Sequence, residues 1–297
     1  MTAPFSLDRW SAERLARVEQ ALSEWVVADA PAGLGEAMRY AVLDGGKRLR
    51  PLLVLAACEA VQGNGEAALR AACAAELIHA YSLVHDDMPC MDNDVLRRGK
   101  PTVHVKFGQA QALLAGDALQ ALAFELLAPE GPSVPPAVQA ALCRLLARSA
   151  GHAGMAGGQA IDLASVGLAL TETQLHDMHK RKTGALLQAS VMMGAACGSS
   201  NETARTALQD YGAAIGLAFQ VVDDILDVTA DSATLGKTPG KDAAQDKPTY
   251  VSLLELQRSR AYAQELLAQA TQALDRSELP DTRALRALAM MVVNREN

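Results

Sequence analysis

Apolar residues recur at helical spacing along almost the whole chain, and this periodicity constrains the fold more than any other feature. Aromatic residues make up only 4% of the chain, while alanine and leucine are abundant, and both facts favour helices over sheets. No segment shows the alternating pattern of a half-buried strand. The pattern predicts helices over residues 8–28, 33–43, 48–62, 66–87, 108–128, 134–150, 171–198, 202–228, 247–275 and 281–294.

The breaks between these expected helices contain proline, glycine or asparagine, as helix ends usually do. None of them is long enough, or rich enough in small residues, to act as a linker between two domains. Half of the residues are apolar (50%), which is sufficient for a sizeable core. We therefore expect a large single-domain, all-α helical bundle over residues 1–297.

Charge, cysteine content and hydropathy exclude several classes of protein. The net charge of −7 argues against a nucleic-acid partner. The five cysteines are scattered and form no Cys-x-x-Cys pair, which argues against a disulfide framework and a structural zinc site. The N-terminus has charges of both signs and lacks the apolar stretch of a signal peptide. Apolar runs such as GALLQASVMMGAACG are too short to cross a bilayer, so we expect no membrane span and a cytoplasmic location.

Two clusters of carboxylates interrupt otherwise apolar helical segments. The first, HDDMPCMD, contains Asp86, Asp87 and Asp92, and the second, VVDDILD, contains Asp223 and Asp227. Neither has a basic residue within one helical turn, and like charges this close repel one another unless a cation binds. Ligands that are all oxygen suit magnesium, so these five aspartates are predicted to bind Mg²⁺. The alternative for one cluster alone is a solvated acidic loop, but two such clusters argue against it.

The geometry of a helix ranks the carboxylates of the second cluster. Asp223 and Asp227 are four residues apart and therefore lie on one face. Asp224 points about 100° away from Asp223, so it is predicted to be a weaker ligand.

Basic residues occur in several separate motifs that suit phosphate binding. In DGGKRLRP, Gly46 lets the backbone approach an anion closely, and Lys47 and Arg50 share one helical face. Two cations at a helix start oppose the macrodipole, so helix stability does not explain them. Taken singly, each basic run has the alternative of a solvated face, and Arg48 is assigned to such a face. The other predicted phosphate-binding residues are Arg97 and Arg98 in LRRGKPT, Lys182 in HKRKTG, Lys237 in LGKTPGKD and Lys247 in DKPTY.

His79 lies two helical turns before Asp86 and therefore on the same face. The alternative for a lone histidine is a satisfied core residue, but this face leads to the carboxylates, so we assign His79 to phosphate binding. Magnesium-binding carboxylates, separate phosphate clamps and an apolar helical interior together describe a site for a phosphorylated, apolar substrate.

These motifs resemble those of the trans-type polyprenyl diphosphate synthases, in order and in approximate spacing. The resemblance covers roughly residues 10–295 and is greatest to the bacterial farnesyl diphosphate synthases, whose first aspartate motif has the same two extra residues as DDMPCMD. The matching motifs are GGKRLRP, HDDMPCMD, LRRGKPT, GMAGGQAIDL, HKRKTGALL, FQVVDDILD and TLGKTPGKDAAQDKPTY. The resemblance implies an isoprenoid synthase fold with a deep central cavity, a homodimer and three Mg²⁺ ions per site.

The resemblance also implies residue roles. Isopentenyl diphosphate is expected to bind to Lys47, Arg50, His79 and Arg98, close to Gly46. Arg97, Lys182 and Lys237 are expected to bind the allylic diphosphate, which Lys247 contacts when the site closes. Thr183 and Gln220 are expected beside the reacting carbons. The implied reaction condenses isopentenyl diphosphate with dimethylallyl or geranyl diphosphate by ionisation, condensation and elimination, and it gives farnesyl diphosphate.

Product length depends on Tyr81, which lies five residues before Asp86. In the family a bulky residue there is the floor that stops the growing chain, and the alternative is ordinary core packing of a tyrosine. The resemblance favours a fifteen-carbon product, while geranyl or geranylgeranyl diphosphate remains the alternative. A non-catalytic subunit is a further alternative, although such a subunit would be expected to lose metal or phosphate residues. The tail NREN contains Arg295, to which no role is assigned.

Overall fold

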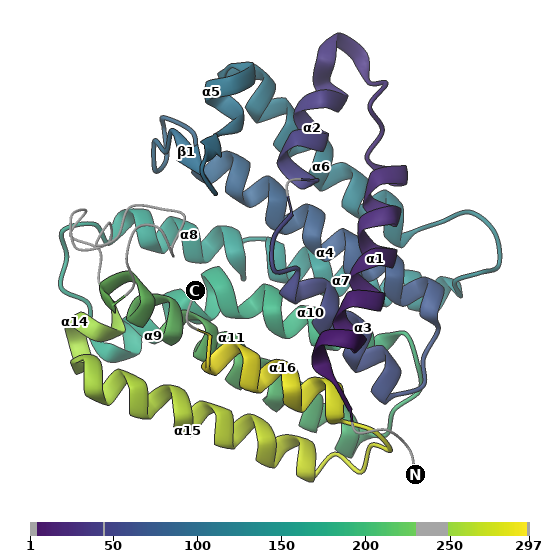
Figure 1. Cartoon of the computed structure of the whole chain (residues 1–297), viewed down its shortest axis with the longest axis vertical. Helices are drawn as coiled ribbons and strands as arrows, with labels where there is room; N and C mark the ends of the chain where they lie inside the picture. The colour runs from purple at the N-terminus through teal and green to yellow at the C-terminus, as the bar shows by residue number, and fades with distance from the viewer. Residues whose placement is uncertain (1–4, 44, 230–248, 296–297) are drawn as a thin grey trace.

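The computed structural model describes residues 5–43, 45–229 and 249–295 (Figure 1). Over these ranges the chain is almost entirely helical, which confirms the predicted fold class. The helices are α1 (Leu7–Trp25), η1 (Pro31–Gly33), α2 (Leu34–Val42), α3 (Leu49–Ala60), α4 (Gly65–Asp86), α5 (Val103–Phe107), α6 (Gln109–Leu127), α7 (Pro136–Ala150), α8 (Met155–Ala164), α9 (Glu172–His179), η2 (Lys180–Gly184), α10 (Ala185–Ala196), α11 (Glu202–Thr229), α14 (Tyr250–Leu254), α15 (Leu256–Asp275) and α16 (Arg283–Val293).

Local side-chain chemistry fixes several helix starts close to where the sequence predicts them. Asn64 caps α4, because its side-chain oxygen accepts hydrogen bonds from the backbone N–H groups of Glu66 (3.0 Å) and Ala67 (2.9 Å). Thr171 and Gln174 form a reciprocal capping box at the start of α9. These caps satisfy backbone donors that would otherwise lack partners at a helix start.

The structure differs from the predicted elements in a few places. The single helix predicted over 171–198 is divided by η2, a five-residue π-helix, and the one predicted over 247–275 breaks at Glu255, whose φ is +65°. Helices α5 and α8 were not predicted. An antiparallel pair of two-residue strands, β1 (Leu96–Arg97) and β2 (Lys100–Pro101), is too short to give a strand pattern in the sequence.

Helix α4 lies at the centre of one half of the bundle, where it packs against α3 and α6 (Figure 1). Helix α10 connects the two halves, because it packs against both α3 and α11, and α15 lies along α11 on the far side. The buried apolar residues of α4 are spread around the helix and do not form a single face, as expected for a helix inside a core. This packing brings the C-terminal end of α4 and the C-terminal half of α11 to the same cavity.

Two helices of the described ranges, α4 and α6, have the length and apolarity of membrane-crossing helices, whereas the sequence predicts no membrane span. In α4 the apolar stretch is 67% buried inside the protein, and α6 packs against it. Core packing therefore accounts for the composition of α4.

Candidate active site

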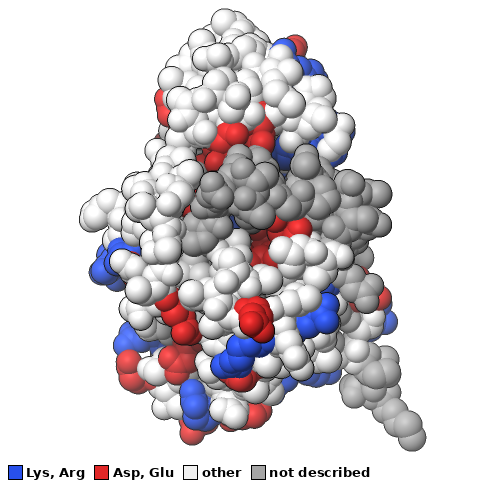
Figure 2. All heavy atoms as spheres, turned by 90° about the vertical axis from the view of Figure 1, so that its left-hand side faces the viewer, with Lys and Arg blue, Asp and Glu red and all other residues white. Residues whose placement is uncertain are grey.

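A cavity of about 550 Å³ lies between α4, α8, η2 and α11, and it is called the central cavity below. Figure 2 shows the face of the molecule that lies on the left-hand side in Figure 1, and several acidic side chains lie on this face. Both aspartate clusters and several of the predicted basic residues reach the central cavity. The predicted site residues that line it are Arg50, His79, Tyr81, Asp86, Asp92, Arg97, Lys182, Thr183, Gln220 and Asp223.

The turn after α4 folds the first aspartate cluster back on itself. The backbone N–H of Asp92 donates to the carbonyl oxygen of Asp86 at 2.8 Å, which brings both side chains to the central cavity. Burial raises the pKa of Asp86 to about 6, and the carboxylate of Asp92 adds to this rise, while Lys182 opposes it. A carboxylate with a raised pKa beside a second carboxylate favours binding of a cation.

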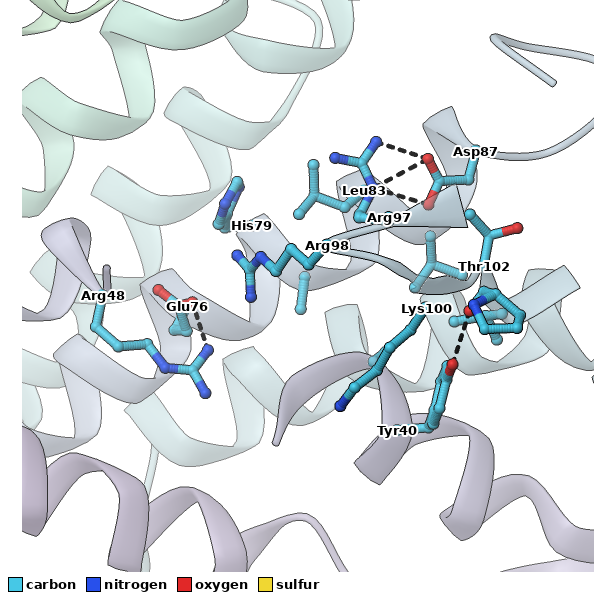
Figure 3. Close-up of a pocket in the computed structure, with 15 residues that line it drawn as sticks. Tyr40, Arg48, Glu76, His79, Leu83, Asp87, Arg97, Arg98, Lys100 and Thr102 are labelled. Atoms are coloured by element: carbon cyan, nitrogen blue, oxygen red, sulfur yellow. Dashed lines mark hydrogen bonds and ion pairs between the residues drawn. The ribbon is translucent and has the colours of Figure 1, made fainter. Parts of the chain in front are cut away.

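Asp87 has a basic partner, contrary to the expectation that the first cluster lacks one. Arg97 donates to both of its carboxylate oxygens, from Nε at 3.0 and 2.9 Å and from Nη2 at 2.6 Å (Figure 3). The side chain of Asp87 is only 3% exposed and does not line the central cavity. Arg97 lies on β1, and the hairpin of β1 and β2 places it next to Asp87. Arg97 and Asp87 are ten positions apart in the sequence. In this arrangement Asp87 orients Arg97.

The second cluster also differs from its helical-wheel prediction. The side chain of Asp223 is 41% exposed and lines the central cavity, but Asp227 is buried and does not line it. Asp224, predicted to point away, does line the cavity. Its carboxylate accepts hydrogen bonds from Gln220 Nε2 (2.8 Å) and from the backbone N–H of Tyr250 (2.7 Å). Asp224 therefore ties α11 to α14.

Thr183 and Gln220 meet at the wall of the central cavity. The hydroxyl of Thr183 donates to Gln220 Oε1 at 3.0 Å, and the amide of Gln220 in turn donates to Asp224. Their helices approach closely because Gly216 has no side chain: a Cβ there would lie 2.8 Å from the Cα of Gly184. The π-helix and α11 thus place two hydrogen-bonded side chains, Thr183 and Gln220, next to each other at the wall of the central cavity.

Lys182 reaches the same cavity from η2, and Nζ donates to Oδ2 of Asp162 on α8 at 2.5 Å. Sequence reasoning gave Asp162 no role, although it lies in the motif GMAGGQAIDL. Gln159 of that motif also lines the cavity, buried, and neither polar atom of its amide has a hydrogen-bond partner within the described residues. The unmatched amide marks a place where a ligand could supply the missing partner.

Arg50, which is buried, and His79, which is half-buried, line one wall of the central cavity. Burial lowers the pKa of Arg50 to about 10, although the carboxylate of Glu76 opposes this effect, and the Nε of Arg50 has no hydrogen-bond partner within the described residues. Burial lowers the pKa of His79 well below its usual value, and Arg50 and Arg98 lower it further, so its imidazole is neutral at pH 7. A buried guanidinium with an unused donor is suited to a phosphate oxygen.

A smaller pocket of about 50 Å³ adjoins this wall and shares His79 and Arg97 with the central cavity (Figure 3). It is called the basic pocket below, and it is also lined by Arg48, Glu76, Arg98 and Lys100. Arg98 donates from Nη1 to the carbonyl oxygen of Gly45 at 2.5 Å. A Cβ on Gly46 would lie 2.8 Å from the Arg98 guanidinium, and its φ of +128° also favours glycine.

Lys47 and Arg295 lie near Asp223, at another part of the site. Burial lowers the pKa of Lys47, and Arg295 lowers it further, while Asp223 opposes the change. Arg295 donates to the carbonyl oxygen of Phe219 at 2.7 Å and to Asp223 Oδ1 at 3.4 Å, and its guanidinium lies 4.0 Å from the Phe219 ring centroid. Arg295 had no predicted role, because this contact joins residues 72 positions apart.

Tyr81 lines the central cavity one and a half helical turns before Asp86 on α4. Its ring makes an edge-to-face contact with His85, with 5.6 Å between the ring centroids. Lys237 and Lys247 lie outside the described residues.

Within the described ranges, no three carboxylate, histidine or cysteine side chains converge closely enough to hold a metal ion by themselves. Magnesium does not require such a cluster, because it is usually held by one or two carboxylates together with water and phosphate oxygens. Asp86, Asp92 and Asp223 supply carboxylates from two sides of one cavity. The cations that line it, Arg50, Arg97 and Lys182, provide phosphate partners. The donor set therefore fits magnesium bound together with a diphosphate.

The sequence profile of the family described as "Polyprenyl synthetase" matches residues 31–286, which include both aspartate clusters and η2. The chain belongs to the polyprenyl synthetase family. It is a short-chain trans-prenyl diphosphate synthase.

Relatives with different product names are similar to this synthase. It is 50% identical over 271 residues to a "Probable farnesyl diphosphate synthase" from Sinorhizobium fredii, which covers 89% of this chain and 81% of the relative. It is 45% identical over 295 residues to the chloroplastic "Geranylgeranyl pyrophosphate synthase" of Capsicum annuum, over 99% of this chain and 80% of the relative. The solved geranyltransferase from Helicobacter pylori, complexed with magnesium and isoprenyl diphosphate, superimposes with a TM-score of 0.85 at 34% identity, over 99% of this chain and 98% of that one.

Proposed function

We propose that this synthase condenses isopentenyl diphosphate with dimethylallyl and geranyl diphosphate to give farnesyl diphosphate. The observation that carries the proposal is the position of Tyr81, a bulky residue that lines the central cavity five residues before Asp86. A growing apolar chain that extends from the carboxylates along α4 would meet this side chain. The farnesyl synthase relative from Sinorhizobium fredii supports the same product.

The second candidate product is geranylgeranyl diphosphate, which the relative from Capsicum annuum favours. A non-catalytic subunit is less well supported, because the central cavity keeps its carboxylates together with Arg50, Arg97 and Lys182.

We assign magnesium binding to Asp86, Asp92 and Asp223, with three ions per site. Asp87 and Asp227, which the sequence also assigns to magnesium, are buried outside the cavity lining and would have to turn toward it to bind a metal directly. The magnesium and isoprenyl diphosphate in the Helicobacter pylori geranyltransferase support this assignment. Bound magnesium would neutralise charge on the departing diphosphate.

The other predicted site residues have separate roles in substrate binding and in the reaction. Lys182 and Arg97 bind the allylic diphosphate and stabilise its charge as the carbon–oxygen bond breaks. Arg50 and neutral His79, with Lys47 and Arg98 and close to Gly46, bind isopentenyl diphosphate. The oxygens of Thr183 and Gln220 face the allylic carbon, and the apolar walls exclude water that would quench the cation. The isopentenyl double bond attacks this carbon, and the proton lost afterwards goes to the departed diphosphate. Lys237 keeps its predicted role in binding the allylic diphosphate, and Lys247 its predicted contact with that diphosphate when the site closes.

We also propose a single domain that acts as a homodimer in the cytoplasm. Leu113 and Leu114 of α6 are about half exposed (47% and 53%), and Val105 beside them is 49% exposed, which supports a second copy of the chain as the partner for this face. Light scattering of the purified protein would give the mass of a dimer if this is correct.

Product analysis tests the proposed function directly. The protein is incubated with magnesium, isopentenyl diphosphate and dimethylallyl diphosphate, and the products are separated by chain length and identified by mass spectrometry. A dominant fifteen-carbon diphosphate is expected. Mainly twenty carbons would establish the second candidate, and no product would revive the non-catalytic subunit.

A further inference from the structure

Arg48 is buried, and it is not part of the solvated basic face to which the sequence assigned it. Its side chain is 2% exposed, and its backbone has a φ of +47°, an unusual conformation for a residue other than glycine. The guanidinium donates to Glu76 Oε1 (2.7 Å), to Glu19 Oε1 (2.6 Å) and to the carbonyl oxygen of Val42 (2.7 Å). One side chain therefore joins α1, α4 and the end of α2 at the point where α3 begins.

Glu76 is the buried member of this network and lies beside the phosphate-binding residues. Its side chain is 5% exposed, whereas that of Glu19 is 40% exposed. Glu76 precedes His79 by three residues on α4, so both lie on the face toward the basic pocket. Figure 3 shows the guanidinium of Arg98 pointing toward Glu76 and His79. The carboxylate of Glu76 also stabilises the charges of Arg50 and Arg98 against the effect of burial.

We propose that Glu76, through its buried ion pair with Arg48, is a positioning residue that holds the cationic subsite for isopentenyl diphosphate in its binding geometry. The proposal rests on the assignment of Lys47, Arg50 and Arg98 to that substrate. Without the counter-charge of Glu76, the cations around it repel one another, and solvent screens the charge of Arg50 poorly because Arg50 is buried. Arg48 lies between Lys47 and Arg50 in the chain, so anchoring Arg48 also fixes their backbone.

The proposal is testable because simple electrostatics and a positioning role predict opposite effects on diphosphate binding when the charge of Glu76 is removed. A carboxylate next to an anion site repels the anion, so its neutralisation alone would strengthen diphosphate binding. If Glu76 instead positions the cations, its neutralisation weakens binding, because a displacement of about 1 Å in a site costs up to about 10²-fold.

The experiment compares Glu76→Gln with Glu19→Gln. Both variants remove one carboxylate from Arg48, but only the first lies at the basic pocket. The KM for isopentenyl diphosphate is expected to rise at least roughly tenfold in Glu76→Gln, with the KM for the allylic diphosphate changed by less than about threefold. Glu19→Gln is expected to change both values by less than about threefold, because its carboxylate is partly exposed. Arg48→Lys keeps the charge but loses the planar fork, and it is expected to raise the same KM if Glu76→Gln does not fold.

An unchanged or lower KM for isopentenyl diphosphate in folded Glu76→Gln would overturn the proposal. The proposal would also be overturned if kcat fell and both KM values rose by similar factors while the melting temperature fell. That pattern indicates a residue with a merely structural role. Titration with inorganic diphosphate in the presence of EDTA separates this proposal from the proposed function. If the wild type makes no product, the proposed function fails by itself, and equal diphosphate affinities of wild type and Glu76→Gln would then refute the positioning role.

Discussion

His179 provides a quantitative test of how burial controls stability in this site. Its ring lies stacked on Tyr250, with 5.5 Å between the ring centroids, and neither ring nitrogen has a hydrogen-bond partner within the described residues. Burial, with a further contribution from Lys182, lowers its pKa from 6.5 to about 4. Below pH 6.5 the unfolded chain therefore binds a proton that the folded protein excludes, and stability falls until the pH reaches about 4.

The size of this effect follows from the shift. At pH 4.5 the exclusion of the proton lowers the free energy of unfolding by about 2.5 kcal/mol relative to pH 7.5, with one pKa unit equal to about 1.4 kcal/mol. Phenylalanine has a similar shape and cannot be protonated. The replacement His179→Phe also removes no hydrogen bond from the folded protein within the described residues. We therefore expect the variant to lose about 2.5 kcal/mol less than the wild type between the two pH values.

Urea unfolding of both proteins at pH 7.5 and pH 4.5, without magnesium, measures the difference. The control is His152→Phe, because His152 is exposed, and it is expected to change the pH dependence by less than about 0.5 kcal/mol. Parallel losses of stability in His179→Phe and the wild type would refute the reasoning, because the buried imidazole would then contribute nothing to acid lability.

Three further variants test other parts of the site. Lys182→Met is expected to lower kcat/KM for the allylic substrate by about 10²-fold or more, measured by steady-state kinetics. The control is Lys180→Met, whose kcat/KM is expected to stay close to that of the wild type because Lys180 is exposed. Gly216→Ala is expected to lower the free energy of unfolding by about 1–3 kcal/mol, because its Cβ would lie 2.8 Å from the Gly184 backbone; a melting temperature equal to that of the wild type would contradict this. Tyr81→Ala is expected to shift the main product from fifteen to twenty carbons, and an unchanged product distribution would show that Tyr81 is not the floor.

The local pattern of the sequence predicts most of the fold, since helical periodicity and caps such as Asn64 depend on neighbouring residues. The π-helix over Lys180–Gly184 escaped prediction, because its apolar and polar residues fit an ordinary helix equally well. The break at Glu255 was missed for a similar reason, since its side chain gives no signal for a positive φ.

The composition of the candidate site was more predictable than its internal pairing. The sequence motifs identified most of the charged residues that line the central cavity. They did not show that Asp87 pairs with Arg97, or that Arg48 is buried against Glu76, because these partners are distant in the sequence. A helical wheel also ranked Asp227 above Asp224, since it does not include the packing of α14 against α11.

The π-helix has a consequence for how this sequence tolerates insertions and deletions. A π-turn is equivalent to one residue inserted into a regular helix, so removing one residue from Lys180–Gly184 would allow α9 and α10 to join as a continuous α-helix. Because the π-turn absorbs its extra residue locally, the same deletion would leave α9 and α10 in phase but would move the side chains within the turn around the helix axis. Lys182 and Thr183 could then no longer both face Asp162 and Gln220, so a more regular helix would form at the expense of these two contacts in the central cavity.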